Sequence, residues 1–213
     1  MTSESGDADR AEASEEAQFP TVPNGSLEAG GWSLRDTRVE VRARVAGFVV
    51  RAHERRYEDD QLRERVSAAG GPDHLWRLFY ATRLTFRPPL PPAFGPAMAL
   101  PKVRSAAREE FAEQLRAEGL TEIEQDEDER IEVKSGTQAR VTRYDATLPV
   151  ETDDGHREVS MDGWIGIWHD GAMLLAGGLY PSAPLSNVLD VDLDYDPTAS
   201  CEELRSLIRH VEG

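Results

Sequence analysis

The chain has 213 residues, 39% of them hydrophobic, and this length and composition suit a single folded domain with one core. Its 40 acidic residues outnumber the 24 basic ones, which gives a formal net charge of −16. Such a charge repels the phosphate backbone of nucleic acids and the surface of anionic membranes. The composition therefore argues against nucleic acid and membrane lipid as partners.

The basic residues are almost all arginines, and Lys102 and Lys134 are the only lysines. An acidic surface with little lysine is typical of proteins kept soluble in concentrated salt, where salt screens the repulsion between carboxylates. A GC-rich genome that favours arginine codons produces the same bias. Both interpretations, a halophilic source and a codon bias, stay open.

Cys201 is the only cysteine, which excludes an intrachain disulfide and a thiolate metal cluster. The first residues lack the apolar core of an export signal. No stretch approaches the roughly 18 apolar residues of a membrane span. We therefore expect a cytoplasmic protein without a membrane span.

Composition divides the chain into three parts. Residues 1–18 are acidic and rich in serine and alanine, which predicts a disordered tail. Residues 19–31 carry two prolines and three glycines and are interpreted as a linker. We expect a single domain over residues 32–213.

The first half of this domain alternates between strand and helix patterns. Apolar and charged residues alternate over 39–45, which predicts a strand, and the apolar positions change parity at Phe48, Val50 and Ala52, which predicts a β-bulge at Gly47. A short helix fits residues 62–66, and a further strand is expected over 79–86. The prolines between 88 and 101 predict a stiff, extended crossing loop.

The clearest helix is predicted over 102–118, because apolar residues recur four apart on one stripe and Gly119 suits its C-terminal cap. That stripe consists of Val103, Ala107, Phe111 and Leu115. Short strands at 120–124 and 130–134 are expected to flank an acidic turn, and a longer strand is expected over 138–150.

Residues 159–180 form two apolar runs separated by Asp170-Gly171, a strong signal for a two-residue hairpin turn. That turn sets a register in which Trp168 faces Met173. Both faces of the hairpin are apolar, which places it in the middle of a sheet covered on both sides. With the short connections before it, this predicts an α+β fold, a central, mainly antiparallel sheet covered by the 102–118 helix and a C-terminal helix.

The hairpin also holds the first candidate site. Glycines within a strand admit a close neighbour, either a helix or ring packed on the sheet or a bound ligand. If a helix or an aromatic ring packs there, the glycines have a structural role. If a ligand binds there, the residues that form its groove are Trp164, Gly166, Trp168 and Gly177.

His169 and Asp170 form a second candidate, because a histidine beside a carboxylate can act as a general base. The alternative is that Asp170 serves only the turn and His169 points into water. No nucleophile motif accompanies the pair.

A third candidate is a calcium loop, since four acidic residues stand at EF-hand ligand positions. They are Asp192, Asp194, Asp196 and Glu203. Pro197 occupies the place where that loop needs glycine, so the alternative is an acidic edge strand followed by a helix with a Ser200–Glu203 capping box. Histidine spacing and glycine patterns indicate no other metal site and no cofactor.

Several runs carry a family resemblance: LTFRPPLPPAFGPA, ARVTRY, WIGIWHDG and AGGLYP. Over roughly residues 32–180 they resemble a haloarchaeal protein family that contains a domain of unknown function. Some relatives look like exported lipoproteins, but this chain lacks the lipid-bearing cysteine near its start. The order of elements is similar to the α/β/α-sandwich of Mog1/PsbP-like proteins, and that resemblance implies an accessory or binding role.

Taken together, these patterns favour a non-catalytic binding or accessory module with a protein or small-molecule partner that the sequence does not name. Two alternatives stay open. One is a hydrolase or transferase that uses His169 and Asp170, and the other is an acidic calcium-binding module.

Overall fold

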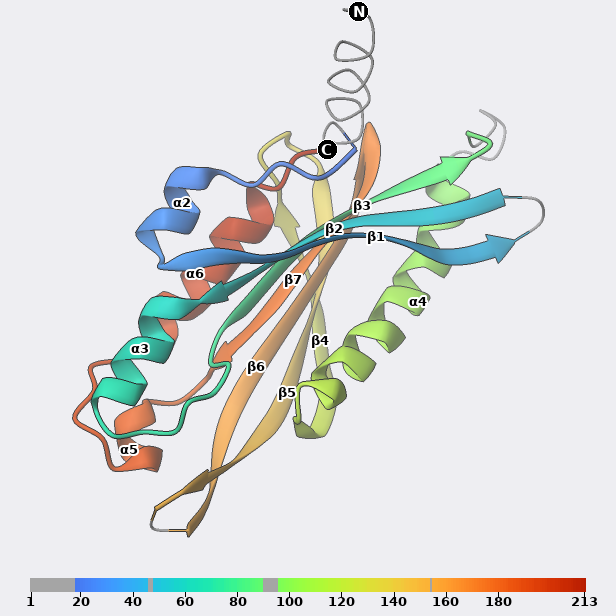
Figure 1. Ribbon diagram of the computed structural model, residues 1–213. Coiled ribbons are helices and arrows are strands. Elements are labelled where there is room, and N and C mark those ends of the chain that lie inside the picture. The colour runs from blue at the N-terminus through green and yellow to red at the C-terminus, as the bar shows by residue number, and fades with distance from the viewer. Residues whose placement is uncertain (1–17, 46–47, 90–95, 154) are drawn as a thin grey trace, which may run out of the picture.

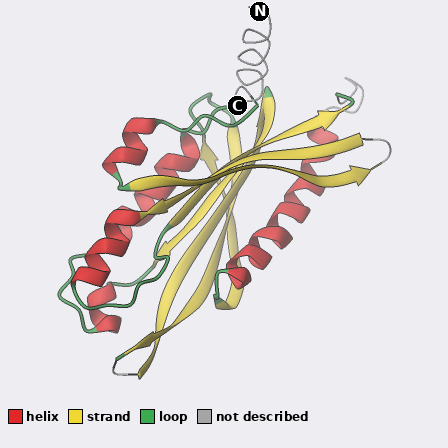
Figure 2. Ribbon diagram, viewed as in Figure 1, coloured by secondary structure: helices red, strands yellow, loops and turns green. Residues whose placement is uncertain are grey.

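The computed structural model describes residues 18–45, 48–89, 96–153 and 155–213, and its centre is one antiparallel sheet of seven strands (Figure 1). The strand order across the sheet is β1-β2-β3-β7-β6-β5-β4. The strands are β1 (Trp32–Val45), β2 (Phe48–Asp59), β3 (Leu78–Arg87), β4 (Thr121–Glu132), β5 (Gln138–Thr152), β6 (Gly155–Asp170) and β7 (Ala172–Pro181). The helices are α2 (Asn24–Ala29), α3 (Asp60–Ala68), α4 (Pro96–Ala117), α5 (Leu185–Leu189) and α6 (Pro197–Arg209) (Figure 2). The predicted α+β class and antiparallel sheet are confirmed.

Strands β6 and β7 lie in the middle of the sheet and are buried along most of their length. Helix α4 packs against one face, where the Phe111 ring would lie 3.1 Å from a Cβ added to Gly163. Helix α6 packs against the other, where Ile208 would lie 3.2 Å from a Cβ added to Gly166 (Figure 1). The strand glycines therefore let both helices approach the sheet closely.

The hairpin register differs by one residue from the prediction. Trp168 pairs with Leu174 rather than Met173, because Asp170 pairs directly with Ala172 and Gly171 alone occupies the bend at φ +65°. A shift of one residue moves every side chain of a strand to the other face. Leu174 consequently shares the α6 face with Trp168, and Met173 lies on the α4 face.

The segment expected to be a linker belongs to the folded domain, which corrects the prediction for residues 19–31. Residues Asn24–Ala29 form helix α2, and Leu27 is buried with Val22 in the core on the α6 side. Thr21 exchanges two backbone hydrogen bonds with Glu212, of 2.7 and 3.0 Å. Its prolines and glycines shape turns rather than a mobile connection. The acidic tail predicted for residues 1–18 lies outside the described residues except for Gln18.

Helix α4 begins at Pro96, not at residue 102, so the prediction of an extended loop as far as Pro101 is wrong. A proline inside a helix lacks one N–H donor, but it does not prevent the helix from continuing on either side. The early start adds a turn and a half of helix ahead of Lys102.

The predicted acidic turn at residues 126–129 is wrong, because β4 runs through it as one strand with two register shifts. Two of the carboxylates there have partners from other elements. Asp128 accepts hydrogen bonds from Arg108 of α4 and Thr142 of β5, and Glu129 pairs with Arg205 of α6. Because these carboxylates are paired with arginines, their charge does not require a solvent-exposed turn.

The C-terminal segment also differs from the expectation. Residues 190–196 form no strand, and Val191 and Tyr195 are buried as an irregular strap. Helix α6 starts at Pro197, and the side chain of Asp196 caps it by accepting from the backbone N–H of Thr198. The capping box at Ser200 is therefore wrong.

A buried ion cluster joins distant elements near the start of α6. Arg77 is 6% exposed and donates to Asp59 at 2.7 Å and also to Glu203. Its guanidinium lies 4.6 Å from the centre of the Trp32 ring, and Trp32 donates to Glu203 at 2.8 Å. The cluster fixes β1, α3 and α6 relative to one another. The resemblance to the Mog1/PsbP arrangement stays a prediction.

We expect Gly178→Ala to destabilise the domain more than Gly166→Ala. The new Cβ of residue 178 would lie 2.1 Å from the backbone oxygen of Leu78, which cannot move without disturbing the ladder, whereas the nearest atoms to residue 166 are side-chain methyls of Ile208 and Val141 at 3.2 and 3.4 Å. Overpacking costs about 1–3 kcal/mol, and we expect Gly178→Ala to reach that range and Gly166→Ala to stay below it. Urea unfolding midpoints measure the difference, and equal losses would contradict this account of the sheet.

Candidate functional site

A groove runs between α4 and strands β1–β3, β6 and β7, on the α4 face of the sheet. We call it the α4 groove. Its cavity volume is about 340 Å³, and its walls are mostly apolar. The apolar lining includes Val50, Leu84, Phe86, Val103, Ile165 and Leu175.

The groove exists because small side chains face one another across it. Ala52 of β2 lies opposite the helix, and α4 contributes Ala99, Ala106 and Ala107 to the lining. The C-terminal half of α4 is anchored differently, by Phe111, which is 1% exposed. The helix is thus held tightly at one end and spans a hollow at the other.

Glu54 supplies the main polar group of the groove. It continues the inward-facing positions of β2 and is 4% exposed. Its carboxylate accepts from Arg38 Nε and Nη2 at 3.0 and 2.6 Å and from the Thr82 hydroxyl at 3.1 Å. Arg42 Nη2 lies 3.6 Å from the second carboxylate oxygen. A buried carboxylate needs such partners to offset its lost hydration.

Glu110 faces Glu54 from α4, and Arg42 lies between the two because it also pairs with Glu110. Burial raises the pKa of Glu110, with Arg42 opposing the shift and Glu54 adding to it. Burial also raises the pKa of Tyr80 well above its usual range, and the charges of Glu54 and Glu110 add to that. Tyr80 is therefore a neutral phenol at physiological pH.

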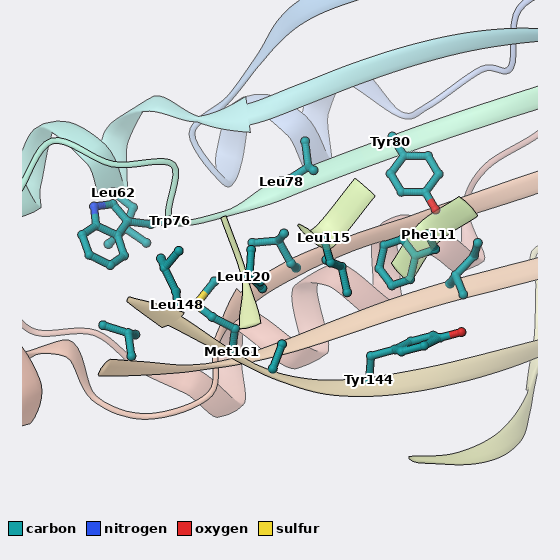
Figure 3. Packing of buried hydrophobic residues seen from close by; sticks show 14 of the residues in the cluster. Leu62, Trp76, Leu78, Tyr80, Phe111, Leu115, Leu120, Tyr144, Leu148 and Met161 are labelled. Carbon is teal, nitrogen blue, oxygen red and sulfur yellow. The ribbon is translucent and has the colours of Figure 1, made fainter. Parts of the chain in front are cut away.

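Three aromatic rings pack against one another beside α4, and two of them, Tyr80 and Phe111, line the groove (Figure 3). The ring centres of Tyr80 and Phe111 are 6.1 Å apart, and those of Phe111 and Tyr144 are 5.3 Å apart. A second cavity of about 180 Å³ lies against Tyr80, Phe111 and Glu54. It continues toward the C-terminal end of α4, where Glu118 is among its lining residues.

The four residues of the ligand groove predicted at the hairpin lie on two different faces of the sheet. Trp164, Gly166 and Trp168 lie on the α6 face, where the two tryptophans are 6% and 1% exposed beneath the helix. Gly177 lies on the opposite face, against the Tyr80 hydroxyl. Both glycines adjoin neighbouring protein atoms, and a ligand groove at these four residues stays a prediction.

His169 and Asp170 sit at the end of β6 beside the bend and are both half-buried. Within the described ranges, no hydrogen bond or ion pair links the His169 side chain to another group, and neither residue lines the α4 groove. A catalytic role for the pair stays a prediction.

The four acidic residues of the candidate calcium loop are not brought together. Asp196 caps α6, Glu203 is held by Arg77 and Trp32, and Asp192 and Asp194 are not buried. Among the residues whose placement is described, no group of three or more acidic, histidine or cysteine side chains could hold a metal ion.

Sequence reasoning missed the α4 groove, although one signal was present. Val50, Ala52 and Glu54 occupy alternate positions of β2, so a carboxylate stands in line with inward-facing apolar residues. An acidic residue on the apolar face of a strand indicates a buried polar group and hence a candidate site. The opposing alanines of α4 give no such signal, because alanine is common in any helix.

A protein-family model matches residues 19–212 of this chain. It describes a domain of unknown function, DUF6517. The chain belongs to the DUF6517 family. The DUF6517 match begins at Phe19, which agrees with the inclusion of α2 in the folded domain.

Neither the curated proteins nor the solved structures include a match to this DUF6517 chain. Across the part of the chain that the structure describes, none of the helices combines the length and the apolar character that crossing a membrane requires.

We expect Glu54→Ala to lower the free energy of unfolding by about 1.5–3 kcal/mol, because Arg38 and Thr82 lose a charged acceptor. The loss of unfolding free energy should lie at the lower end of this range, because the Arg38 side chain is 37% exposed and water can replace the Glu54 carboxylate as its partner. Glu40→Ala is the matched control: Glu40 also pairs with Arg38 but is 43% exposed, so its loss should stay below about 0.5 kcal/mol. Equal urea unfolding midpoints for the two variants would contradict the role given to Glu54.

Proposed function

We propose that this DUF6517 protein is a non-catalytic binding module that holds a small apolar molecule in the α4 groove. The observation that supports this is a largely apolar cavity of about 340 Å³ with a few convergent polar groups. That combination of size and lining is typical of small-molecule sites. A protein partner would need a broader exposed apolar surface than this narrow lining offers.

The polar groups of the groove suit orientation of a ligand better than proton transfer. The carboxylate of Glu54 is already engaged by Arg38 and Thr82. The phenol of Tyr80 stays neutral because burial raises its pKa. A general base needs a free oxygen or nitrogen within reach of the substrate. These two groups therefore favour binding over catalysis.

An uncharged dye tests this function. Nile red, which brightens in apolar surroundings, is expected to bind the wild-type chain and to lose affinity at least tenfold in Ala107→Leu, because the added side chain fills the groove. Filling a cavity also commonly stabilises a protein, by about 0.5–2 kcal/mol. We therefore expect Ala107→Leu to melt no lower than the wild type.

Ala112→Leu is the matched control, because Ala112 lies on the same helix but lines neither cavity. It should leave dye affinity unchanged. A wild-type chain that does not bind the dye, or a dye that binds Ala107→Leu equally well, would overturn the proposed function.

We also propose a halophilic, haloarchaeal source and a cytoplasmic location. The net charge of −16 and the two lysines among 24 basic residues support the first. The cytoplasmic location stays a prediction from the sequence. At low salt the acidic side chains repel one another over about 10 Å, and at 1 M salt over about 3 Å.

Thermal melts in KCl test the halophilic proposal. We expect the melting temperature to rise as KCl increases from about 0.1 to about 1 M, because screening relieves repulsion that the folded state concentrates. A melting temperature that falls over this range would leave arginine codon bias as the explanation of the composition.

A further inference from the structure

We propose that the molecule held in the α4 groove is an anion with an apolar body, and that Lys102 binds its charged group. This inference rests on the proposed function and adds the chemical class of the ligand. It begins from the charges that line the groove.

Two cationic residues line the α4 groove, Arg42 and Lys102. The charge of Arg42 is already used, because its guanidinium lies 3.2 Å from Glu40 and 3.6 Å from Glu54 and also pairs with Glu110. Lys102 is exposed, and among the described residues no carboxylate lies within ion-pair distance of it. Of the two cations that line the groove, the Lys102 ammonium is thus the one that no described carboxylate engages.

The two ends of the groove differ in the charged and apolar groups that line them. Lys102 and Glu110 are eight residues apart on α4, about 12 Å along the helix axis. Around Lys102 the lining is apolar, with Val103 on the next position of the helix and Phe86 on β3. At the other end Glu54 and Glu110 are neutralised by arginines.

This arrangement favours an anionic ligand over a cationic one. A cationic group would have to displace a guanidinium from Glu54 or Glu110, at the cost of existing charged hydrogen bonds. An acid group can approach Lys102 without displacing any partner, while its apolar body lies along the walls beside it. Long-range repulsion by the acidic surface is screened by salt, whereas the contact at Lys102 is shorter than the screening length.

A matched pair of fluorescent probes tests the inference: cis-parinaric acid and its methyl ester, which share one apolar body and differ in charge. Binding is measured at the lowest salt at which circular dichroism shows the folded chain. We expect the acid to bind more tightly than the ester. Lys102→Gln should weaken binding of the acid about twofold to fivefold, the range for an exposed ion pair, and leave the ester unchanged.

Two further variants complete the design. Lys102→Arg restores the charge and should restore acid binding. Lys134→Gln is the control, because Lys134 pairs with Glu212 at 3.1 Å and lies outside the groove. If Lys102→Gln weakens neither probe, or weakens both equally, the role of Lys102 is wrong while the groove function stands. If neither probe binds the wild type, the groove function itself fails.

Discussion

The fold depends on the burial of β6 and β7 on both faces, which requires a helix to approach each face closely. Glycines at the contact points make this possible, since any side chain at Gly163 would press on Phe111 of α4 and one at Gly166 on Ile208 of α6. A strand without side chains at these points loses some intrinsic strand preference, which the packing of two helices offsets. Once both helices are seated there, their directions across the sheet are set.

The α4 groove is a consequence of how α4 is seated. Phe111 anchors its C-terminal half, and ahead of this anchor the helix presents alanines to strands that also carry a small residue, Ala52. Small groups on both sides leave a hollow that cannot close, because the anchored end fixes the distance between helix and sheet. Glu54 can be tolerated in such a wall because Arg38 and Thr82 satisfy it.

The sequence predicted the antiparallel sheet, the two apolar runs of the hairpin and the body of α4, because each follows from local periodicity. It missed the register by one residue, since Asp170-Gly171 suits a two-residue turn and nothing local shows that Gly171 alone forms the bend. Because of this one-residue difference in register, Leu174 and Met173 each lie on the face opposite to the one predicted. The burial of Trp164 and Trp168 beneath α6 could not be predicted from the hairpin, because it depends on a helix that is distant in sequence.

Charged residues were the least predictable part of the chain, because their role depends on partners far away in sequence. Asp128 and Glu129 look like a solvent-exposed turn, yet Arg108 and Arg205 from two different helices hold them in a continuous strand. Glu203 looks like a capping or calcium-binding residue, yet Arg77 of another segment engages it. A chain with an excess of acid therefore commits many of its arginines to structure. Under that constraint the proposal at Lys102 rests on a cation beside an apolar groove for which the described residues supply no carboxylate partner.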